Sequence, residues 1–158
     1  MTDRADLPEW RRWAGRIRPI VRCVIRRGTD VLLIREDDRE GGAGAHWFPP
    51  GGGIDFWETA EEALERELLE ELGARVVDVT FLGVLEARRV LGEERHHHLC
   101  LIYEGRFADP AMYERDEFEI TEPTVTLTAR WMSIDGFRFG LEPLHPQGLL
   151  DLMTRESG

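Results

Sequence analysis

The sequence predicts a single mixed α/β domain for three reasons. Apolar runs separated by turn residues indicate β-hairpins in both halves of the chain. One capped amphipathic helix lies between them, and a second helical pattern at residues 146–153 closes the chain, with Leu149, Leu150 and Met153 expected to face the core. A chain of 158 residues can form one hydrophobic core, and no repeat or linker divides it. We therefore expect one domain over residues 1–158.

The first elements follow from the N-terminal segment and the first apolar runs. Residues 1–18 are expected to form an N-terminal helix or arm, with a helical pattern at residues 7–14. Residues 19–26 and 31–35 are typical of the two strands of a hairpin. Residues 27–30 contain a glycine and would form its turn.

The middle of the chain combines a glycine-rich segment with a helix. Residues 36–45 are charged and then glycine-rich, which predicts a loop, and residues 47–53 predict a short strand that runs into a tight glycine turn. Such a turn allows backbone groups to approach a ligand closely. In the helix that follows, Thr59 and Glu62 form a capping box, and Gly73 marks the helix end.

The second half of the chain predicts further strands. Residues 81–90 and 96–107 are expected to form a long hairpin across residues 91–94. Residues 108–123 are highly charged and predict a loop. A strand is expected after it, at residues 124–132.

The composition limits the classes of partner and compartment. With a net charge of −11 and a pI of about 4.9, the chain is not expected to bind nucleic acid or an anionic membrane. No apolar run is long enough for a membrane span, and the charged N-terminus shows no sign of a signal peptide. Cys23 and Cys100 lie in apolar runs and are expected to be core residues without a disulfide, which favours a reducing cytoplasm.

Three glutamates of the predicted helix lie on one narrow arc. At about 100° per residue, Glu70 lies about 60° to one side of Glu67, and Glu71 lies about 40° to the other. Neighbouring like charges destabilise a helix, whereas Mg²⁺ or Mn²⁺ binds oxygen ligands of this kind. The alternative is that the glutamates form only a solvated helix face, as charged helix residues usually do.

The apolar stripe of the same helix argues against that alternative. Its members are Ala60, Leu64, Leu68 and Leu72. Glu71 projects between Ala60 and Leu64, at the edge of the stripe. The opposite side already has its own polar residues, Glu62, Glu65 and Arg66. A carboxylate at the edge of a buried stripe needs a partner, and a metal ion would supply one.

The segment from Gly52 to Ala74 resembles a Nudix box, the pattern G-x5-E-x7-R-E-U-x-E-E-x-G-U in which U is aliphatic. The residues at its defined positions are Gly52, Glu58, Arg66, Glu67, Leu68, Glu70, Glu71, Gly73 and Ala74. A chance match at this composition is on the order of one in a million or rarer. The resemblance implies the Nudix fold, an α/β/α sandwich around a mixed β-sheet. It also implies a Mg²⁺-dependent hydrolase of a nucleoside diphosphate linked to another group.

The resemblance further implies roles for individual residues. It implies that one or more Mg²⁺ or Mn²⁺ ions bind the carboxylates of Glu67, Glu70 and Glu71 and the carbonyl oxygen of Gly51. Arg66 would orient the site by bridging to Glu58 and Glu67. The bound ion would neutralise the phosphoryl oxygens and activate the attacking water.

The general base is open between two kinds of residue. Members of the family use either a box glutamate, such as Glu67 or Glu70, or an acidic residue of a later loop. In the charged segment before the last predicted strand, Glu122 is the first choice because it immediately precedes Pro123 and that strand. Glu119 is the second choice.

Several residues outside the box are candidates for substrate binding. Arg35 and Arg22 lie on the first predicted hairpin, from which they could bind a substrate phosphate. Trp47 could stack on a base, or it could enter the core. The three histidines at 96–98 are not expected to bind one metal ion, because consecutive strand residues face opposite sides. Trp57 stands where the family commonly has glycine.

The substrate and two rival functions remain open from the sequence. Arg89 replaces the proline typical of ADP-ribose pyrophosphatases, and Leu91 stands near the tyrosine position of diadenosine polyphosphate hydrolases. The expected partner is a small nucleotide derivative, and a homodimer is possible. A non-catalytic nucleotide sensor is one rival, although sensors generally lose box glutamates. Isopentenyl-diphosphate isomerase is the other, although neither cysteine lies in a recognisable motif for it.

Overall fold

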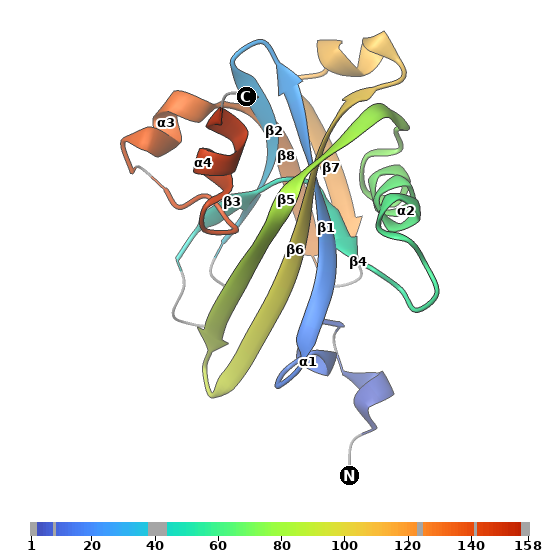
Figure 1. Ribbon diagram of the computed structural model, residues 1–158, viewed down its shortest axis with the longest axis vertical. Coiled ribbons are helices and arrows are strands. Elements are labelled where there is room, and N and C mark those ends of the chain that lie inside the picture. Colours follow the sequence, from blue (N-terminus) through green and yellow to red (C-terminus); the bar gives the residue numbers. More distant parts are fainter. Residues whose placement is uncertain (1–2, 8, 38–43, 123–124, 141, 156–158) are drawn as a thin grey trace.

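The computed structural model shows a mixed β-sheet with helices on both sides (Figure 1). The residues that it describes are 3–7, 9–37, 44–122, 125–140 and 142–155. Helix α2 (Ala60–Leu72) covers one face of the sheet, and α3 (Ile134–Arg138) and α4 (Leu149–Thr154) lie on the other. The predicted α/β/α arrangement is therefore confirmed.

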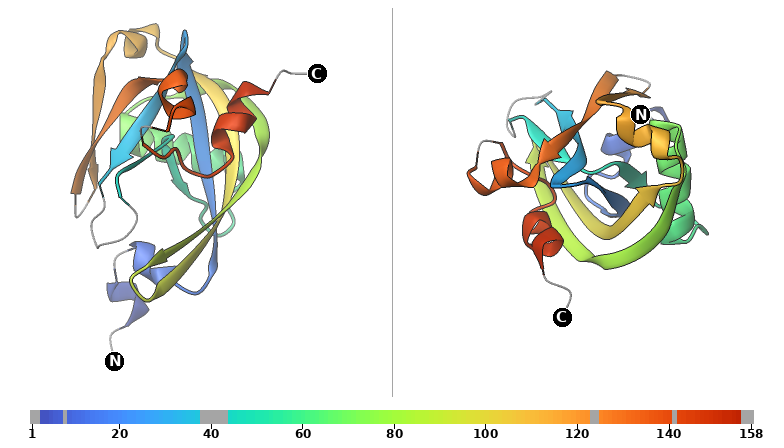
Figure 2. Two further views of the ribbon diagram at one scale, coloured as in Figure 1. Left: turned by 90° about the vertical axis from the view of Figure 1, so that its left-hand side faces the viewer. Right: turned by 90° about the horizontal axis from the view of Figure 1, so that it is seen from above.

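Eight strands in the described residues form this sheet, in the order β5-β6-β1-β2-β8-β7, with β4 paired to β1 and β3 paired to β2. Their bounds are β1 (Ile17–Arg27), β2 (Asp30–Glu36), β3 (His46–Phe48), β4 (Gly51–Gly53), β5 (Val76–Leu91), β6 (Glu94–Phe107), β7 (Glu117–Glu122) and β8 (Val125–Ser133). Short helical segments flank them, namely η1 (Arg4–Asp6), α1 (Glu9–Arg12) and η2 (Pro110–Glu114). Viewed from above in Figure 2, β5 and β6 curve strongly around β1. No helix in these residues is long and apolar enough to cross a membrane.

Strand β1 is the centre of the sheet because it changes partners along its length. From Ile17 to Ile25 it runs parallel to β6. At its end it forms the predicted hairpin with β2, in which Arg26 pairs with Val31. Along its middle it also pairs antiparallel with β4. The second predicted hairpin, β5 with β6, is confirmed and is longer than expected.

The two faces of the sheet bury separate groups of apolar side chains. Leu64 and Leu68 of α2 pack in one group, which also contains Cys23. Leu149 and Met153 of α4 pack in the other, which also contains Cys100, whereas Leu150 is only partly buried. Both cysteines are free thiols in the core, as the sequence predicts.

The prediction of a loop over residues 108–123 is wrong for much of its length. The structure places η2 and then β7 there, and β7 pairs with β8 along its whole length. Phe118 and Ile120 are buried and alternate with exposed acidic and polar residues, which is the pattern of a strand with one buried face. Residues 123–124 of this segment lie outside the described residues, as do residues 38–43 of the earlier predicted loop.

The predicted glycine turn after Trp47 is also different in the structure. Gly51–Gly53 form strand β4, and Gly52 pairs with Val21 of β1. Glycine has low intrinsic preference for a strand, so this strand depends on pairing with a distant partner. The close approach that the turn was expected to provide is nevertheless present, because β4 lies between β1 and α2.

Candidate active site

The glycines of β4 let three elements approach one another more closely than side chains would allow. A Cβ atom on Gly51 would lie 2.0 Å from the carbonyl oxygen of Val21. A Cβ atom on Gly52 would lie 2.3 Å from the carboxyl carbon of Glu67. Both separations are too short for a real side chain. The box glycine is therefore required by the position of Glu67 against the backbone of β4.

The capping residues fix the start and end of α2. The Thr59 hydroxyl accepts a hydrogen bond from the backbone N–H of Glu62, and the Glu62 carboxylate accepts one from the backbone N–H of Thr59. Gly73 adopts the left-handed conformation, with φ of 63°. The predicted capping box and helix end are confirmed. Because both ends are fixed by local residues, each glutamate has a fixed angular position around the helix axis relative to Thr59 and Gly73.

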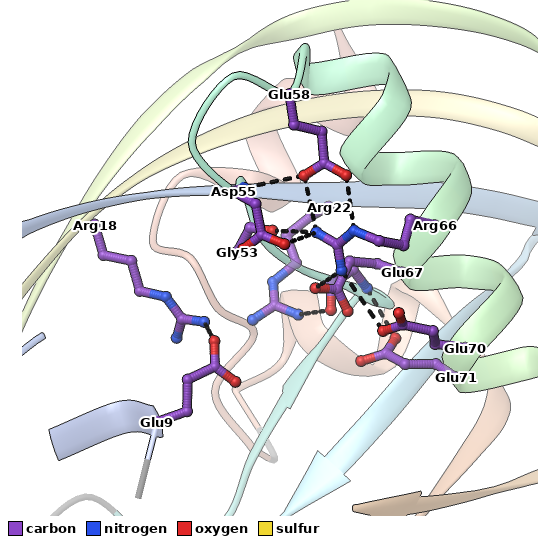
Figure 3. A network of polar contacts seen from close by, with 11 residues as sticks. Glu9, Arg18, Arg22, Gly53, Asp55, Glu58, Arg66, Glu67, Glu70 and Glu71 are labelled. Carbon is purple, nitrogen blue, oxygen red and sulfur yellow. Dashed lines mark hydrogen bonds and ion pairs between the residues drawn. The ribbon is translucent and has the colours of Figure 1, made fainter. Parts of the chain in front are cut away.

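Arg66 joins the helix to the loop before it and to β4 (Figure 3). It donates hydrogen bonds to both carboxylate oxygens of Glu58, at 2.7 and 2.9 Å. It also donates to Glu67 Oε1 and to the carbonyl oxygen of Gly53, each at 3.0 Å. The hydrogen bonds from Arg66 are the main reason why the pKa of Glu58 is lowered to about 2. Glu70 is more exposed than Glu58 and Glu67, and its Oε2 atom lies 3.6 Å from Arg66 Nη1.

Glu71 is half-buried and lies against the backbone of β4. Its Oε2 accepts a hydrogen bond from the backbone N–H of Gly51 at 3.0 Å. Burial raises the pKa of Glu71 to about 8; the charge of Arg22 and the Gly51 hydrogen bond lower it, while the charges of Glu67 and Glu122 raise it further. Burial also raises the pKa of Glu67, and its contact with Arg66 opposes that shift. Buried carboxylates that repel one another are stabilised by a cation.

These oxygen donors suit a hard divalent cation. Mg²⁺ prefers carboxylate and carbonyl oxygens, which Glu67, Glu70, Glu71 and Gly51 supply. In the described residues, no three acidic, histidine or cysteine side chains already converge as a set of metal ligands. The fit therefore depends on the type of donor and on the position of Glu71, where a bound cation would favour the charged carboxylate.

Glu122 lies within electrostatic reach of Glu71, although the two are far apart in the sequence. It is the last residue of β7, and its charge is one of the causes that raise the pKa of Glu71. Along β7 it has the same parity as Phe118 and Ile120, which face the core beside α2. Glu119 has the opposite parity, and both glutamates are exposed. Of the two acidic residues named from the sequence, the strand geometry favours Glu122.

The three predicted substrate-binding residues lie in two places. Arg22 donates hydrogen bonds to the carbonyl oxygens of Pro49 and Gly51, at 3.3 and 3.2 Å, next to the box. Arg35 and Trp47 instead meet at Glu142: Arg35 Nη2 lies 3.1 Å from Glu142 Oε1, and the Trp47 indole donates to Oε2.

Arg35 and Trp47 also line a groove of about 430 Å³ together with residues of β8 such as Val125 and Thr128. Trp47 is only 6% exposed, so most of its ring belongs to the core. Glu142 was missed from the sequence, because it lies outside any periodic pattern. Arg18, four residues before Arg22 on the same face of β1, was missed although strand periodicity could have indicated it.

Trp57 adopts a backbone conformation that favours glycine. Its φ is 71°, in the left-handed region, at the position where the family commonly has glycine. Its side chain is 91% exposed and its neighbour Phe56 is 95% exposed. The two rings lie 6.2 Å apart on the loop between β4 and α2.

His98 lies on β6 opposite Arg18 and makes this face of the sheet sensitive to acid. Burial, followed by the charges of Arg18 and Arg22, lowers its pKa from 6.5 to about 4. Because the folded pKa is below the unfolded value, stability is retained above pH 6.5 and falls as the pH drops towards 4. The difference corresponds to at most about 3 kcal/mol in the free energy of unfolding.

We expect His98→Gln to reduce this loss of stability, measured by urea unfolding at pH 7.0 and pH 4.5. His97→Gln is the matched control, because His97 faces the opposite side of β6 and is partly exposed. An equal loss of stability between the two pH values in wild type and His98→Gln would contradict this account.

Comparison with known proteins agrees with the box and the fold. The NUDIX domain family matches residues 16–152. A stretch of 111 residues is 39% identical to "Nucleoside triphosphatase NudI" of Salmonella arizonae and covers 66% of this chain and 79% of that protein. A stretch of 104 residues is 36% identical to YtkD of Bacillus subtilis, which is named provisionally as an 8-oxo-dGTP diphosphatase. That stretch covers 65% of this chain but only 58% of YtkD.

Solved structures show the same fold. A NUDIX hydrolase from Nitrosomonas europaea superposes with a TM-score of 0.63 at 21% identity, covering 87% of this chain and 86% of that one. A MutT NUDIX hydrolase from Burkholderia pseudomallei superposes with a TM-score of 0.58 at 28% identity, covering 77% and 86%. With its complete box and the matched domain, the chain belongs to the Nudix hydrolase family.

Proposed function

We propose that this protein is a Mg²⁺-dependent pyrophosphohydrolase, active also with Mn²⁺, that cleaves the diphosphate linkage of a nucleoside diphosphate joined to another group. The observation that carries the proposal is the half-buried Glu71 beside the backbone of Gly51, with Glu67 held nearby by Arg66. A nucleoside triphosphate is one such compound, in which the second group is phosphate. The names of NudI and YtkD support a nucleotide of that kind.

In the proposed reaction, the residues of the site would have separate roles. Glu67, Glu70, Glu71 and the carbonyl oxygen of Gly51 hold the metal ion, which when bound neutralises phosphoryl charge and lowers the pKa of the attacking water. Arg66 positions Glu67 and leaves its second carboxylate oxygen available. Glu122 accepts the proton of the water from the β7 side of the site. Arg22 supplies positive charge for a phosphate oxygen.

The rival functions have less support. Isopentenyl-diphosphate isomerase needs a reactive cysteine, but burial raises the pKa of Cys23 to about 12 and that of Cys100 to about 11. Both thiols belong to the core rather than to the box. A nucleotide sensor would be expected to lack some of the box residues, whereas this chain has them all.

Turnover of a nucleotide panel tests the proposal directly. With Mg²⁺ or Mn²⁺, we expect the protein to release nucleotide products from at least one class among nucleoside triphosphates, nucleoside diphosphates and sugar nucleotides, as measured by liquid chromatography. EDTA should abolish release, because the charge on the phosphoryl oxygens is then no longer neutralised. Recovery of every compound intact after long incubation, with metal demonstrably bound, would instead indicate a sensor.

A second test concerns the proton acceptor. Glu122→Gln should lower kcat by about tenfold to 10²-fold with KM nearly unchanged, since a general base acts in the transition state. Glu119→Gln is the matched control on the opposite face of the same strand, and it should leave both constants unchanged. If Glu122→Gln turns over at the wild-type rate with full metal occupancy, the base is Glu119 or a box glutamate.

A further inference from the structure

Arg18 is a buried arginine at the edge of the proposed active site. It lies on β1, and its side chain is only 14% exposed. Its Nη2 atom lies 2.8 Å from the position that a Cβ atom on Gly53 would occupy. The carbonyl oxygen of the same glycine accepts a hydrogen bond from Arg66. The two guanidinium groups therefore approach Gly53 from different elements, one from the sheet and one from the helix (Figure 3).

The hydrogen-bonding capacity of Arg18 is only partly used. Nη2 donates to the carboxylate of Glu9, which belongs to α1 of the N-terminal arm. Nε is buried and has no hydrogen-bond partner in the described part of the chain. A guanidinium group with an unused buried donor can accept a further oxygen ligand at little additional desolvation cost.

Glu9 brings a negative charge to the edge of the site. Its side chain is 68% exposed, so most of it stays in contact with solvent while its carboxylate pairs with Arg18. Burial lowers the pKa of Arg18. The charge of Glu9 opposes this shift most strongly, and the charges of Glu67 and Asp55 oppose it less. Glu9 is also close enough to Glu67 to raise the pKa of that carboxyl. The Glu9 carboxylate is thus attracted by Arg18 and repelled by the box residue Glu67.

A carboxylate and a phosphate make the same kind of charge-assisted hydrogen bond to a guanidinium group. A phosphate carries more charge than a carboxylate and offers more oxygens, so it can also satisfy the unused Nε donor. A phosphate group that reaches Arg18 therefore has an advantage over Glu9, because its oxygens can bind Nη2 and Nε together.

We propose that Arg18 binds a phosphate group of the substrate, and that Glu9 of the N-terminal arm occupies Arg18 in the ligand-free protein and is displaced by that phosphate. The proposal relies on the proposed function for the identity of the ligand as a phosphate compound. It makes the arm a competitor of the substrate. The two partners of one ion pair should therefore have opposite effects on binding when each is replaced.

Calorimetric binding of dGTP and of inorganic tripolyphosphate tests this, with Ca²⁺ and separately with EDTA. Arg18→Gln should weaken binding of both compounds by about tenfold or more, since a charge-assisted bond is lost. Glu9→Gln should strengthen binding severalfold, and it should have no such effect when combined with Arg18→Gln. Arg18→Lys keeps the charge and should retain part of the affinity, which separates binding from a failure to fold.

A matched control is available on the same arm. Arg11 pairs with Glu94 of β6 at 3.2 Å, so Arg11→Gln weakens the attachment of the arm without removing Glu9 or Arg18. It should strengthen binding less than Glu9→Gln does. With a hydrolysed substrate, Arg18→Gln should raise KM while kcat stays within about twofold, as expected for a group that binds substrate and transition state alike.

The outcomes separate this inference from the proposed function. Opposite effects of the two variants on binding, without hydrolysis of any nucleotide, would leave Arg18 as a phosphate site in a protein that is not this enzyme. Hydrolysis with wild-type affinity and KM in Arg18→Gln would overturn the inference and leave the function standing. Weaker binding in both single variants would also overturn it, because the pair would then be merely structural. If neither dGTP nor tripolyphosphate binds to the wild-type protein, the inference is overturned as well.

Discussion

Glu71→Gln is expected to lower kcat/KM by about 10²-fold or more while the protein remains folded. Glutamine preserves the shape of the side chain and its helix preference, and its oxygen can still accept the hydrogen bond from Gly51. The change removes a carboxyl group whose charged form is disfavoured by burial, so the metal-free protein should be at least as stable as the wild type. What the variant loses is a proposed ligand for the divalent ion.

The measurement needs both steady-state kinetics at saturating Mg²⁺ and urea unfolding in EDTA. Glu65→Gln is a suitable control, because Glu65 lies on the same helix but is exposed and pairs only loosely with Arg75, at 3.4 Å. It should leave both activity and stability nearly unchanged. Near wild-type turnover in Glu71→Gln would remove Glu71 from the metal ligands.

The parts of the site that depend on nearby residues could be predicted from the sequence. The helix has its start at Thr59 and its end at Gly73, and both are fixed by side chains or backbone within a few residues. The spacing of Glu67 and Glu71 then determines which side of the helix they occupy. The contacts from Arg66 to Glu58 and Glu67 span at most eight residues.

The parts that depend on distant pairing could not be predicted. Nothing in three consecutive glycines indicates a strand, and β4 exists because β1 lies beside it. In β7, the alternation of Phe118 and Ile120 was present in the sequence but was obscured by the surrounding charges. The position of Glu122 near Glu71 follows only once β7 is placed in the sheet. Glu142 reaches Arg35 across more than one hundred residues, which no local pattern can indicate.

Arg66→Gln is expected to have the second large effect, on both stability and activity. Arg66 is the only residue in the described part of the chain that hydrogen-bonds to both Glu58 and Glu67 with its side chain. Removing it leaves two largely buried carboxylates without their cation. We expect the free energy of unfolding to fall by about 2 kcal/mol, less than for a fully buried pair because Arg66 is partly exposed.

The loss of activity should come from the position of Glu67 rather than from unfolding. Without Arg66, Glu67 is no longer held against β4, and a misplaced ligand can lower kcat by on the order of 10²-fold. Arg66→Lys keeps the positive charge but loses the two-point contact with Glu58, so it should recover stability more fully than activity. Arg75→Gln, which breaks only the exposed pair with Glu65, is the control and should change neither quantity. If Arg66→Lys restores kcat and stability in equal proportion, charge alone explains the role of Arg66 and its geometry does not.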